Sequence, residues 1–554
     1  MRSGRGCAAL VLAAGLALAA CSGGDTAPTG TGSLGSTADI NEHSRDDIRD
    51  GGDLRLAMTS FPANWNTLQI DGNDGEVADM IKPLMPRSFE TDAAGNLSID
   101  HDFFTDVQMT STSPQVVSYT INPKAVWSDG SPITWEDIAA QANALSGKDK
   151  RFLIAISNGF DRVAKVERGA DDRQAIITFD KPYADWKGQF AGNSMLYPKQ
   201  VTTDPDAFNT SEVNAIGLTS GPFVVRSADR TGGLITLARN PKWWGDQPKL
   251  DTMVYRVLDS NAWTQALQNK EVDAVLLRTI DDLQNVRAVP DLTIRHAPLN
   301  RWRHFTFNGA PGSILADSQL RVAISKAIDR QRIADLMQNG LTAKPEPLNN
   351  HIFLRGQRGY QNNSLGFDPD AAAKELDALG WTRDGTGRVK DGKRLVIRDV
   401  MYNDDTWVQI AKLIQQDLGK VGVELTIDTR PGNRYFADVI QPGDFDVCQF
   451  VFQGDAFPYN GIPQIYGYYP DNLQANFGRI GSPELNDLID KTLSELDPEK
   501  AVQLANQVDR KVFEEGHSLP LIQNEGNYGT RSDLANYGAP GLASYDYTKI
   551  GYLK

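Results

Sequence analysis

Apolar residues recur at helical spacing in three stretches of the second half of the chain. The first stretch, residues 317–340, begins with the N-cap residue types Asp317 and Ser318 and ends at Gly340. Its apolar positions lie three, four, seven and eight residues after the first one: Leu320, Ala323, Ile324, Ala327 and Ile328. The spacing predicts an amphipathic helix over this stretch.

Two further stretches follow the same rule. In residues 367–381, Asp368 and Pro369 are residue types that start helices, and Gly380 is a type that ends them. Residues 404–419 carry four apolar residues on one helical face: Trp407, Ile410, Ile414 and Leu418. We expect one helix in each stretch.

Beyond the third helix the apolar positions alternate instead. Val423, Leu425 and Ile427 are separated by single polar residues, which is the period of a half-buried strand. Further strands are expected in the first half of the chain, at residues 116–122, 175–180, 234–240 and 252–258. This mixture of helices and strands predicts α/β or α+β lobes.

The chain opens with an apolar run of a different kind. Residues 8–20 are almost wholly Ala, Leu, Val and Gly, and they follow Arg2 and Arg5. The run is too short for a membrane span, which needs ~20 apolar residues, and is typical of a secretory signal peptide. Its end, from Leu18 to Cys21, resembles the lipobox of bacterial lipoproteins, which implies cleavage before Cys21 and a lipid on that cysteine. An ordinary signal peptide with an incidental cysteine is the alternative.

Residues 21–50 follow the expected signal peptide of residues 1–20 and are rich in Ser, Gly, Thr and Asp. They hold too few apolar side chains to build a core, so we expect a flexible tether. The tether contains a G-x-G-x-x-G match that begins at Gly30, but this motif indicates dinucleotide binding only between a strand and a helix. We therefore do not interpret it as a cofactor site.

The net charge of the chain argues against one class of partner, nucleic acid. The chain has 56 basic and 71 acidic residues, and loss of residues 1–20 removes two arginines, which leaves 54 basic residues and a formal charge of −17. Such an acidic protein is a poor candidate for nucleic-acid binding. The roughly 500 residues beyond the tether are too many for one core, so two or three domains are expected.

Motif searches find little catalytic chemistry. Only Cys21 and Cys448 remain after cleavage, so no disulfide within the fold is expected, and Cys448 is expected to be a buried free thiol. The sequence has no H-E-x-x-H, P-loop or G-x-S-x-G motif, and its six histidines show no metal-ligand spacing. We expect no enzyme, no metal site and no cofactor, although paired carboxylates would leave no motif.

Several segments resemble, in order, those of bacterial extracytoplasmic solute-binding proteins of family 5, the peptide and oligopeptide class. The longest, WSDGSPITWED at residues 127–137, is similar to the family pattern W-x-D-G-x-P-[IVL]-T-x-x-D. The other matching segments are 221–223, 237–244, 307–308, 320–330, 367–369 and 444–446. With the lipobox, they point to a lipid-anchored binding protein of an ABC importer.

The resemblance implies the fold. It is an α/β, two-lobed fold of periplasmic-binding-protein type II (cluster C), with an extra third domain and a hinge that the chain crosses twice. Lobe one would hold residues 51–297 and 516–554, including the extra domain at about 88–190, and lobe two would hold residues 298–515.

The resemblance also implies a mechanism. The chain would cross the hinge near residues 299–308 and 517–524, so the lobes can close. A ligand that touches both lobes favours the closed state, which the permease then recognises. The implied partners are an oligopeptide, the ABC permease subunits and the membrane through lipid on Cys21. The protein would be a monomer on the outer face of the cell membrane.

The resemblance places the ligand at VFQGDAFP, residues 451–458. In peptide binders of this family, a similar W-x-G-D segment sets an aspartate against the peptide's α-ammonium group, and Asp455 matches this aspartate. Phe452 stands where the family has tryptophan. The alternatives are that Asp455 caps a turn before Pro458 and that Phe452 is a core residue.

Other positions depart from the family pattern. Dipeptide binders carry an arginine just ahead of a Tyr-Asn pair, where it binds the peptide carboxylate, but Arg398 is out of register with Tyr402 and Asn403. This departure favours longer peptides or a non-peptide ligand. Trp65 and Trp302 are further candidate ligand contacts, because indole rings stack on sugars and on peptide side chains.

A second function stays open at this point. Some actinobacterial lipoproteins of this fold act in cell-envelope assembly and bind a glycolipid or a protein partner. Peptide import predicts a closed polar cavity with an acid at its end, whereas the envelope role predicts a broader, aromatic-lined or open cleft. An extracellular enzyme is a remote third alternative.

Overall fold

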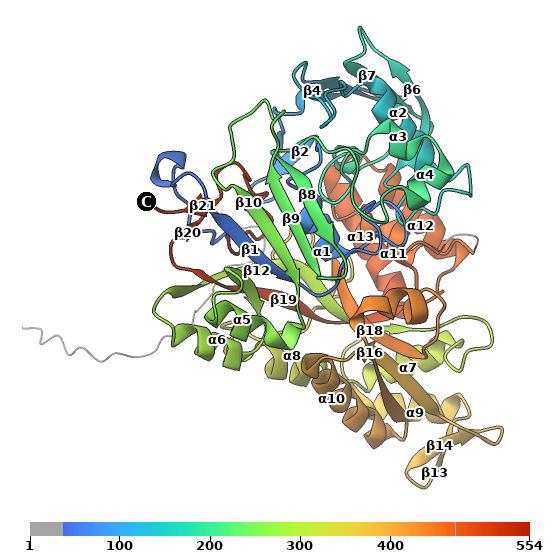
Figure 1. The fold of residues 1–554 in the computed structure, drawn as a ribbon. Helices are drawn as coiled ribbons and strands as arrows, with labels where there is room; N and C mark the ends of the chain where they lie inside the picture. Colours follow the sequence, from blue (N-terminus) through green and yellow to red (C-terminus); the bar gives the residue numbers. More distant parts are fainter. Residues whose placement is uncertain (1–36, 471–472) are drawn as a thin grey trace, which may run out of the picture.

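The structure, a computed structural model, describes residues 37–470 and 473–554. The expected signal peptide, Cys21 and the first part of the expected tether lie outside these residues. Helices and strands alternate along the described chain (Figure 1), so the prediction of a mixed α/β fold is confirmed. Within the described ranges, no helix has the length and apolar character that a membrane crossing requires.

A ten-stranded sheet runs through the molecule. In spatial order its strands are β17 (Glu424–Arg430), β16 (Val396–Tyr402), β18 (Val447–Gln453), β12 (Leu292–Phe307), β19 (Ser518–Arg531), β11 (Ala274–Leu277), β1 (Asp53–Met58), β10 (Thr252–Val257), β9 (Leu234–Arg239) and β8 (Phe223–Asp229). β1 pairs in parallel with β10 and β11, and β16 pairs in parallel with β17 and β18. We call the part around β1 and β8–β11 lobe one, and the part around β16–β18 lobe two.

The long antiparallel strands β12 and β19 join the two lobes. The first half of β12 pairs with the end of β19 beside β11, and its second half pairs with β18. In the middle the register shifts, because β12 advances from Pro298 to Trp302 while β19 advances only from Gln523 to Glu525. Residues 299–301 therefore form a bulge between the lobes, within the segment expected to cross the hinge.

Smaller sheets complete the strand set. A four-stranded antiparallel sheet, β4-β5-β7-β6, lies beside lobe one at the top of Figure 1, within the range expected for the extra domain. The strands of the smaller sheets are β2 (Phe89–Thr91), β3 (Leu97–Ile99), β4 (Phe104–Thr112), β5 (Gln115–Ile121), β6 (Val163–Arg168), β7 (Gln174–Phe179), β13 (Thr382–Asp384), β14 (Gly387–Lys390), β15 (Lys393–Arg394), β20 (Leu534–Ala535) and β21 (Gly551–Tyr552).

The α-helices of the described chain are α1 (Gly75–Ile81), α2 (Trp135–Ala144), α3 (Lys199–Thr202), α4 (Pro205–Thr210), α5 (Trp263–Gln268), α6 (Ile280–Arg287), α7 (Ser318–Lys326), α8 (Arg330–Gln338), α9 (Pro369–Ala378), α10 (Asp405–Val421), α11 (Gly461–Tyr466), α12 (Pro483–Ser494) and α13 (Pro498–Glu514). Residues 317–340 form two helices where the pattern predicts one. Asp329 is the reason, because its carboxylate accepts a hydrogen bond from the Arg332 amide and starts a new helix. The helices predicted around residues 368–380 and 404–419 are confirmed as α9 and α10.

The last part of the expected tether is attached to the folded body. Asp39 and Ala539 exchange two backbone hydrogen bonds of 2.8 and 2.9 Å, and the His43 amide donates to Asn536 Oδ1 at 2.9 Å. Ile48 is fully buried. The expectation of a flexible segment up to residue 50 is therefore wrong for residues 39–50. Sparse apolar content did not exclude backbone pairing with the C-terminal segment.

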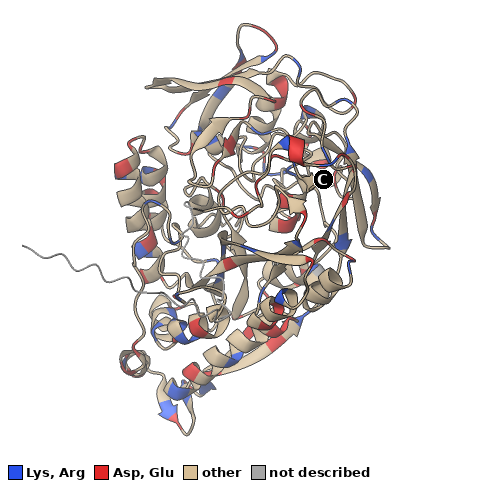
Figure 2. Ribbon diagram, turned by 90° about the vertical axis from the view of Figure 1, so that its left-hand side faces the viewer, with Lys and Arg blue, Asp and Glu red and all other residues tan. Residues whose placement is uncertain are grey.

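Burial and charge follow the expected division between interior and surface. Cys448, in β18, is fully buried and is a free thiol, as the sequence predicts. Acidic and basic residues are interspersed along the ribbon (Figure 2).

Candidate functional site

The carboxyl ends of the parallel strands in both lobes point toward the bulge of β12. In lobe one, β11 ends at Leu277, level with His296 of β12. In lobe two, β18 runs in the opposite direction and ends at Gln453, which pairs with Arg301. Ligands of open α/β sheets bind outside the carboxyl ends of the strands. The junction of the lobes is therefore the candidate binding site.

A cavity of about 180 Å³ lies at this junction. Lobe two supplies residues 453–456 to its wall, and the bulge of β12 supplies residues 299–301. Lobe one supplies side chains of α1, β2 and β10, and the C-terminal segment 537–547 completes the wall. A ligand in this cavity touches both lobes and the hinge at once.

Asp455 presents a carboxylate to the cavity from lobe two. Oδ1 accepts a hydrogen bond from the Phe457 amide at 2.8 Å, and Oδ2 accepts one from the Asn193 amide at 3.3 Å. Burial raises the pKa of Asp455, while these two hydrogen bonds and the charge of Lys82 oppose the rise. No described cation forms an ion pair with it. The site therefore holds a partly desolvated acid that can bind an ammonium group.

An ion-pair cluster forms another part of the wall. Asp79, in α1, accepts hydrogen bonds from Lys82 at 2.7 Å and from Arg301 at 2.5 Å. Gln453 donates to the same carboxylate at 3.1 Å. The cluster links lobe one, the bulge and lobe two through one acid.

Tyrosine side chains surround the remaining space. They come from β10, β19 and the C-terminal segment: Tyr255, Tyr528, Tyr537, Tyr545 and Tyr547. Tyr545 donates its hydroxyl hydrogen bond to the Gly538 carbonyl at 2.7 Å. The cavity wall thus combines the acid Asp455 with several phenol groups.

Two predicted aromatic contacts lie beside this cavity. Phe452, half-buried at the end of β18, stacks on His304 with ring centroids 4.3 Å apart and packs against Trp302 at 5.7 Å. Trp302 is 7% exposed and lies in β12 next to the bulge. The structure brings both rings together behind Asp455, but neither contributes to the cavity wall itself.

The other predicted contacts lie elsewhere. Trp65 is fully buried in the core of lobe one, against Phe61, and does not reach the cavity. Its loop is closed by backbone hydrogen bonds, which turn the indole inward. Tyr402, at the end of β16, packs on Tyr435 at 4.3 Å, and Asn403 is exposed.

Burial is the main cause that raises the pKa of Tyr402, and the charges of Asp74 and Glu76 add to it. This places the Tyr402 ring opposite the start of α1, across the junction. Arg398 is committed to ion pairs with Asp444 at 2.5 Å and Asp428 at 3.3 Å, so it does not serve the cavity.

Sequence reasoning missed Asp79, Arg301 and the tyrosines. They come from segments scattered between residues 79 and 547, and none belongs to a recognisable motif. The carboxyl ends of the strands point to the place, but only the three-dimensional pairing of β12 with β18 and β19 assigns the residues.

Ion pairs also join the lobes outside the cavity, at two places. On one side, Arg278 of lobe one contacts Asp404 of lobe two at 2.5 Å. Burial alone would raise the pKa of Asp404, but the charge and hydrogen bond of Arg278 lower it to about 2. On the other side, Arg162 contacts Asp490 in α12 at 2.5 Å. The lobes are therefore in contact at both ends of the junction.

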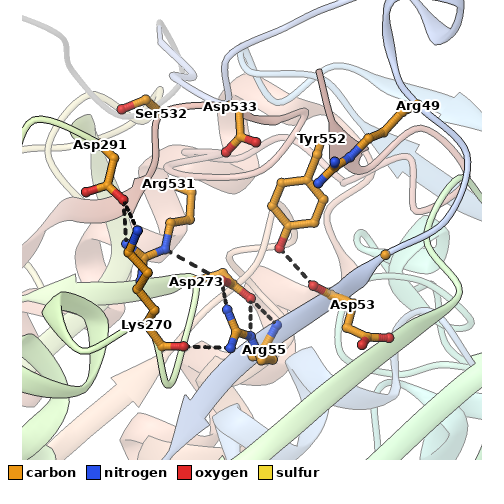
Figure 3. A pocket seen from close by; sticks show the side chains of 11 residues that line it. Arg49, Asp53, Arg55, Lys270, Asp273, Asp291, Arg531, Ser532, Asp533 and Tyr552 are labelled. Carbon is orange, nitrogen blue, oxygen red and sulfur yellow. Dashed lines mark hydrogen bonds and ion pairs between the residues drawn. The ribbon is translucent and has the colours of Figure 1, made fainter. Parts of the chain in front are cut away.

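A second pocket, of about 570 Å³, lies at the far end of lobe one (Figure 3). Its charged side chains pair with one another: Arg55 with Asp273 at 2.6 Å and Lys270 with Asp291 at 2.8 Å. Arg49 lies over the Tyr552 ring at 5.1 Å. These contacts hold β1, β11 and the C-terminus together. The charged residues that line the pocket therefore have a structural role. Across the described chain, no cluster of three or more metal-ligating side chains is present.

Comparison with known proteins finds similarity along almost the whole chain. A sequence model of the family described as bacterial extracellular solute-binding proteins, family 5 (middle), matches residues 103–473. The protein named oligopeptide-binding protein OppA of Mycobacterium tuberculosis H37Rv is 50% identical over 551 residues, covering 98% of this chain and 93% of that protein.

More distant relatives share parts or the fold alone. The protein of M. tuberculosis H37Rv named probable monoacyl phosphatidylinositol tetramannoside-binding protein LpqW is 24% identical over 382 residues, covering 61% of this chain and 57% of that protein. The solved structure of the oligopeptide-binding protein AppA from Bacillus subtilis, in complex with a nonapeptide, superposes with a TM-score of 0.79 at 18% identity. It covers 92% of this chain and 100% of that one. The fold is therefore the two-lobed binding-protein fold expected from the sequence.

Proposed function

Since the chain belongs to the bacterial extracellular solute-binding proteins of family 5, we propose that it captures oligopeptides at the lobe junction and delivers them to the permease of an ABC importer. The single observation that carries this proposal is Asp455. Its carboxylate is partly desolvated, lines the cavity and has no ion-pair partner among the described residues. A peptide's α-ammonium group supplies the missing cation.

The cavity explains capture as well as recognition. Its wall combines residues of lobe one, the bulge of β12 and residues 453–456 of lobe two, so an opened junction cannot offer all contacts together. A ligand therefore has a higher affinity for the closed form and shifts the population toward it. No bond is made or broken in this cycle, so binding alone suffices for the function.

The relatives favour a peptide over the glycolipid alternative. The relative named as an oligopeptide-binding protein matches 98% of the chain at 50% identity, whereas the one named for a mannosylated lipid matches 61% at 24% identity.

We further propose that the protein is attached to the outer face of the cell membrane by lipid on Cys21 and acts as a monomer. The basic start, the short apolar run and the lipobox-like ending at Cys21 support this attachment. Metabolic labelling with a palmitate analogue tests it, because the Cys21→Ala form would take up no label.

The first experiment is native mass spectrometry of a lipid-free form, residues 22–554, purified from a peptide-containing medium. We expect short peptide masses that disappear after denaturation and refolding. Asp455→Ala should lower peptide occupancy at least tenfold, because a charge-assisted hydrogen bond is lost.

Asp487→Ala is the matched control, since Asp487 is an exposed acid of α12 that faces no cavity. It should retain peptides like the unsubstituted protein. A protein without co-purified peptides, whose melting temperature also stays constant with a mixed peptide library, would contradict peptide capture.

A further inference from the structure

Four tyrosine hydroxyls in the cavity wall have no hydrogen bond to any described residue: those of Tyr255, Tyr528, Tyr537 and Tyr547. The side chains of Tyr255 and Tyr547 are only 8% and 7% exposed. None of the four oxygens is fully enclosed, so each is open to the cavity, where water or a ligand can reach it. A ligand that displaces this water must offer hydrogen-bonding groups in its place, because unpaired hydroxyls are unfavourable.

The four hydroxyls lie around one acid of the wall. Burial raises the pKa of each, and the negative charge of Asp79 adds to the rise for each. All four thus keep their protons, and each can donate one hydrogen bond and accept another.

The charged groups around them already have partners. Asp79 pairs with Lys82 and Arg301, at 2.7 and 2.5 Å. Arg87 is paired with Glu90 at 2.7 Å and Asp100 at 3.2 Å. Asp74 and Glu76 act on Arg301 from outside the cavity wall.

On the basis of the proposed peptide binding, we propose that this tyrosine wall is a side-chain subsite that selects an uncharged hydrogen-bonding group, a hydroxyl or a carboxamide, close to the ligand's ammonium group. An apolar side chain would leave the hydroxyls unpaired. A charged side chain of either sign would have to compete with the ion pairs that Asp79 already forms with Lys82 and Arg301. A site built to form hydrogen bonds discriminates strongly against ligands that cannot form them.

Isothermal titration calorimetry of the lipid-free protein with defined tetrapeptides tests the subsite. The peptides are tetra-alanine with Gln, Ser, Leu, Glu or Lys at the first or second position, and their N-acetylated forms. At one of the two positions, Gln or Ser should bind about tenfold tighter than Leu, Glu or Lys. N-acetylation should weaken every peptide, because it removes the ammonium group that Asp455 binds.

The combined change Tyr255→Phe and Tyr547→Phe removes two hydroxyls and keeps the rings. It should bring Gln, Ser and Leu peptides to within about twofold of one another, while the loss on N-acetylation persists. Tyr468→Phe is the matched control, since Tyr468 lies in lobe two outside the cavity wall, and it should keep the preference. If the combined variant does not fold, Tyr528→Phe on β19 replaces it.

The outcomes separate the two proposals. A Leu peptide that binds as tightly as the Gln peptide, or a preference that survives the Phe changes, would overturn the subsite while leaving peptide capture in place. Absence of binding by every tetrapeptide would instead remove peptide capture, and the subsite with it.

Discussion

One buried acid, Asp399, is expected to make the stability of lobe two depend on pH. Asp399, in β16, is fully buried and accepts a hydrogen bond from Gln449 Nε2 at 2.6 Å. Burial raises the pKa of Asp399 to about 8, and the hydrogen bond opposes only part of this rise. Asp399 Oδ1 and Gln449 Oε1 have no partners. Protonation gives Asp399 a donor that Gln449 Oε1 can accept.

The raised pKa of Asp399 predicts how the free energy of unfolding changes with pH. Between the ordinary aspartate pKa of 3.8 and the raised pKa of about 8, the folded state binds more protons than the unfolded state, so the free energy of unfolding falls as pH rises. Asp399→Asn places a neutral donor there and should raise the free energy of unfolding at pH 8 by about 1–3 kcal/mol. Urea unfolding at pH 5 and pH 8 measures both values.

The free energy of unfolding of Asp399→Asn should also differ less between pH 5 and pH 8 than that of the unsubstituted protein. Asp438→Asn is the control, because Asp438 is an exposed acid of the same lobe, and its unfolding curve should keep the pH response of the unsubstituted protein. An Asp399→Asn protein that is less stable at pH 8 would show that the acid is ionised in the folded state.

At the residue scale, sequence could predict only those site residues that belong to a motif. Asp455 was predicted from its place in VFQGDAFP, and it is the predicted residue that lines the cavity. Trp65 was predicted only because an indole ring can stack on a ligand, but it lies in the core, which indole rings fill more often than they bind ligands. Arg301 has no motif, and its role depends on a bulge that no local pattern indicates.

At the scale of elements, the close approach of two strands explains why position 526 is a glycine. Gly526 of β19 pairs with Ala297 of β12, and a Cβ atom at Gly526 would lie 2.2 Å from the Ala297 carbonyl oxygen. The Leu299 side chain would be 2.9 Å away. A larger residue there must separate the two strands that join the lobes.

Gly526→Ala should therefore lower the free energy of unfolding by more than about 2 kcal/mol, as forced overpacking does. Gly419→Ala in α10 is the matched control, since a Cβ there meets nothing within 4 Å. The control should gain about 0.5–1 kcal/mol from helix propensity. Denaturant unfolding of both variants checks the contrast, and equal stabilities would contradict the tight strand contact.

Elements were predictable where capping residues and periodicity agree. α9 and α10 begin at Asp368 and Asp404 as caps, and α10 ends at Gly422 with φ of 84°. The break between the two helices of residues 317–340 was harder to predict, because Asp329 can lie inside a helix or cap the start of a second one. Residues 39–50 paired through their backbone, which composition does not indicate.

For the whole molecule, the bridges Arg278–Asp404 and Arg162–Asp490 hold the lobes together without a ligand. Exposed ion pairs contribute little, but Asp404 is 7% exposed and Arg162 is 4% exposed, so their attraction is less screened. The balance between closed and open forms should depend on both bridges.

The combined change Arg278→Gln and Asp490→Asn should open the lobes. Small-angle X-ray scattering should show an increase of about 1 Å on a radius of gyration of about 24 Å. Arg151→Gln with Arg434→Gln is the control, because each of these exposed arginines pairs within its own lobe. An unchanged scattering curve would mean that packing at the junction, and not the bridges, keeps the lobes closed.

The two-lobed arrangement could be predicted only from the family resemblance. Periodicity identified individual strands, but the partners β12 and β19 are separated by more than 200 residues. Their pairing depends on how the whole chain between them folds. The boundaries expected for the lobes stay predictions.

The docking of residues 39–50 has a mechanical consequence. These residues and the C-terminal segment both belong to lobe one, and they are bonded to each other through Asp39, Ala539 and Asn536. A force applied at residue 37 is therefore transmitted into lobe one before it reaches β12 and β19. With the N-terminal end held at the membrane, as proposed above, lobe one would be the stationary body and lobe two the arm that turns against it.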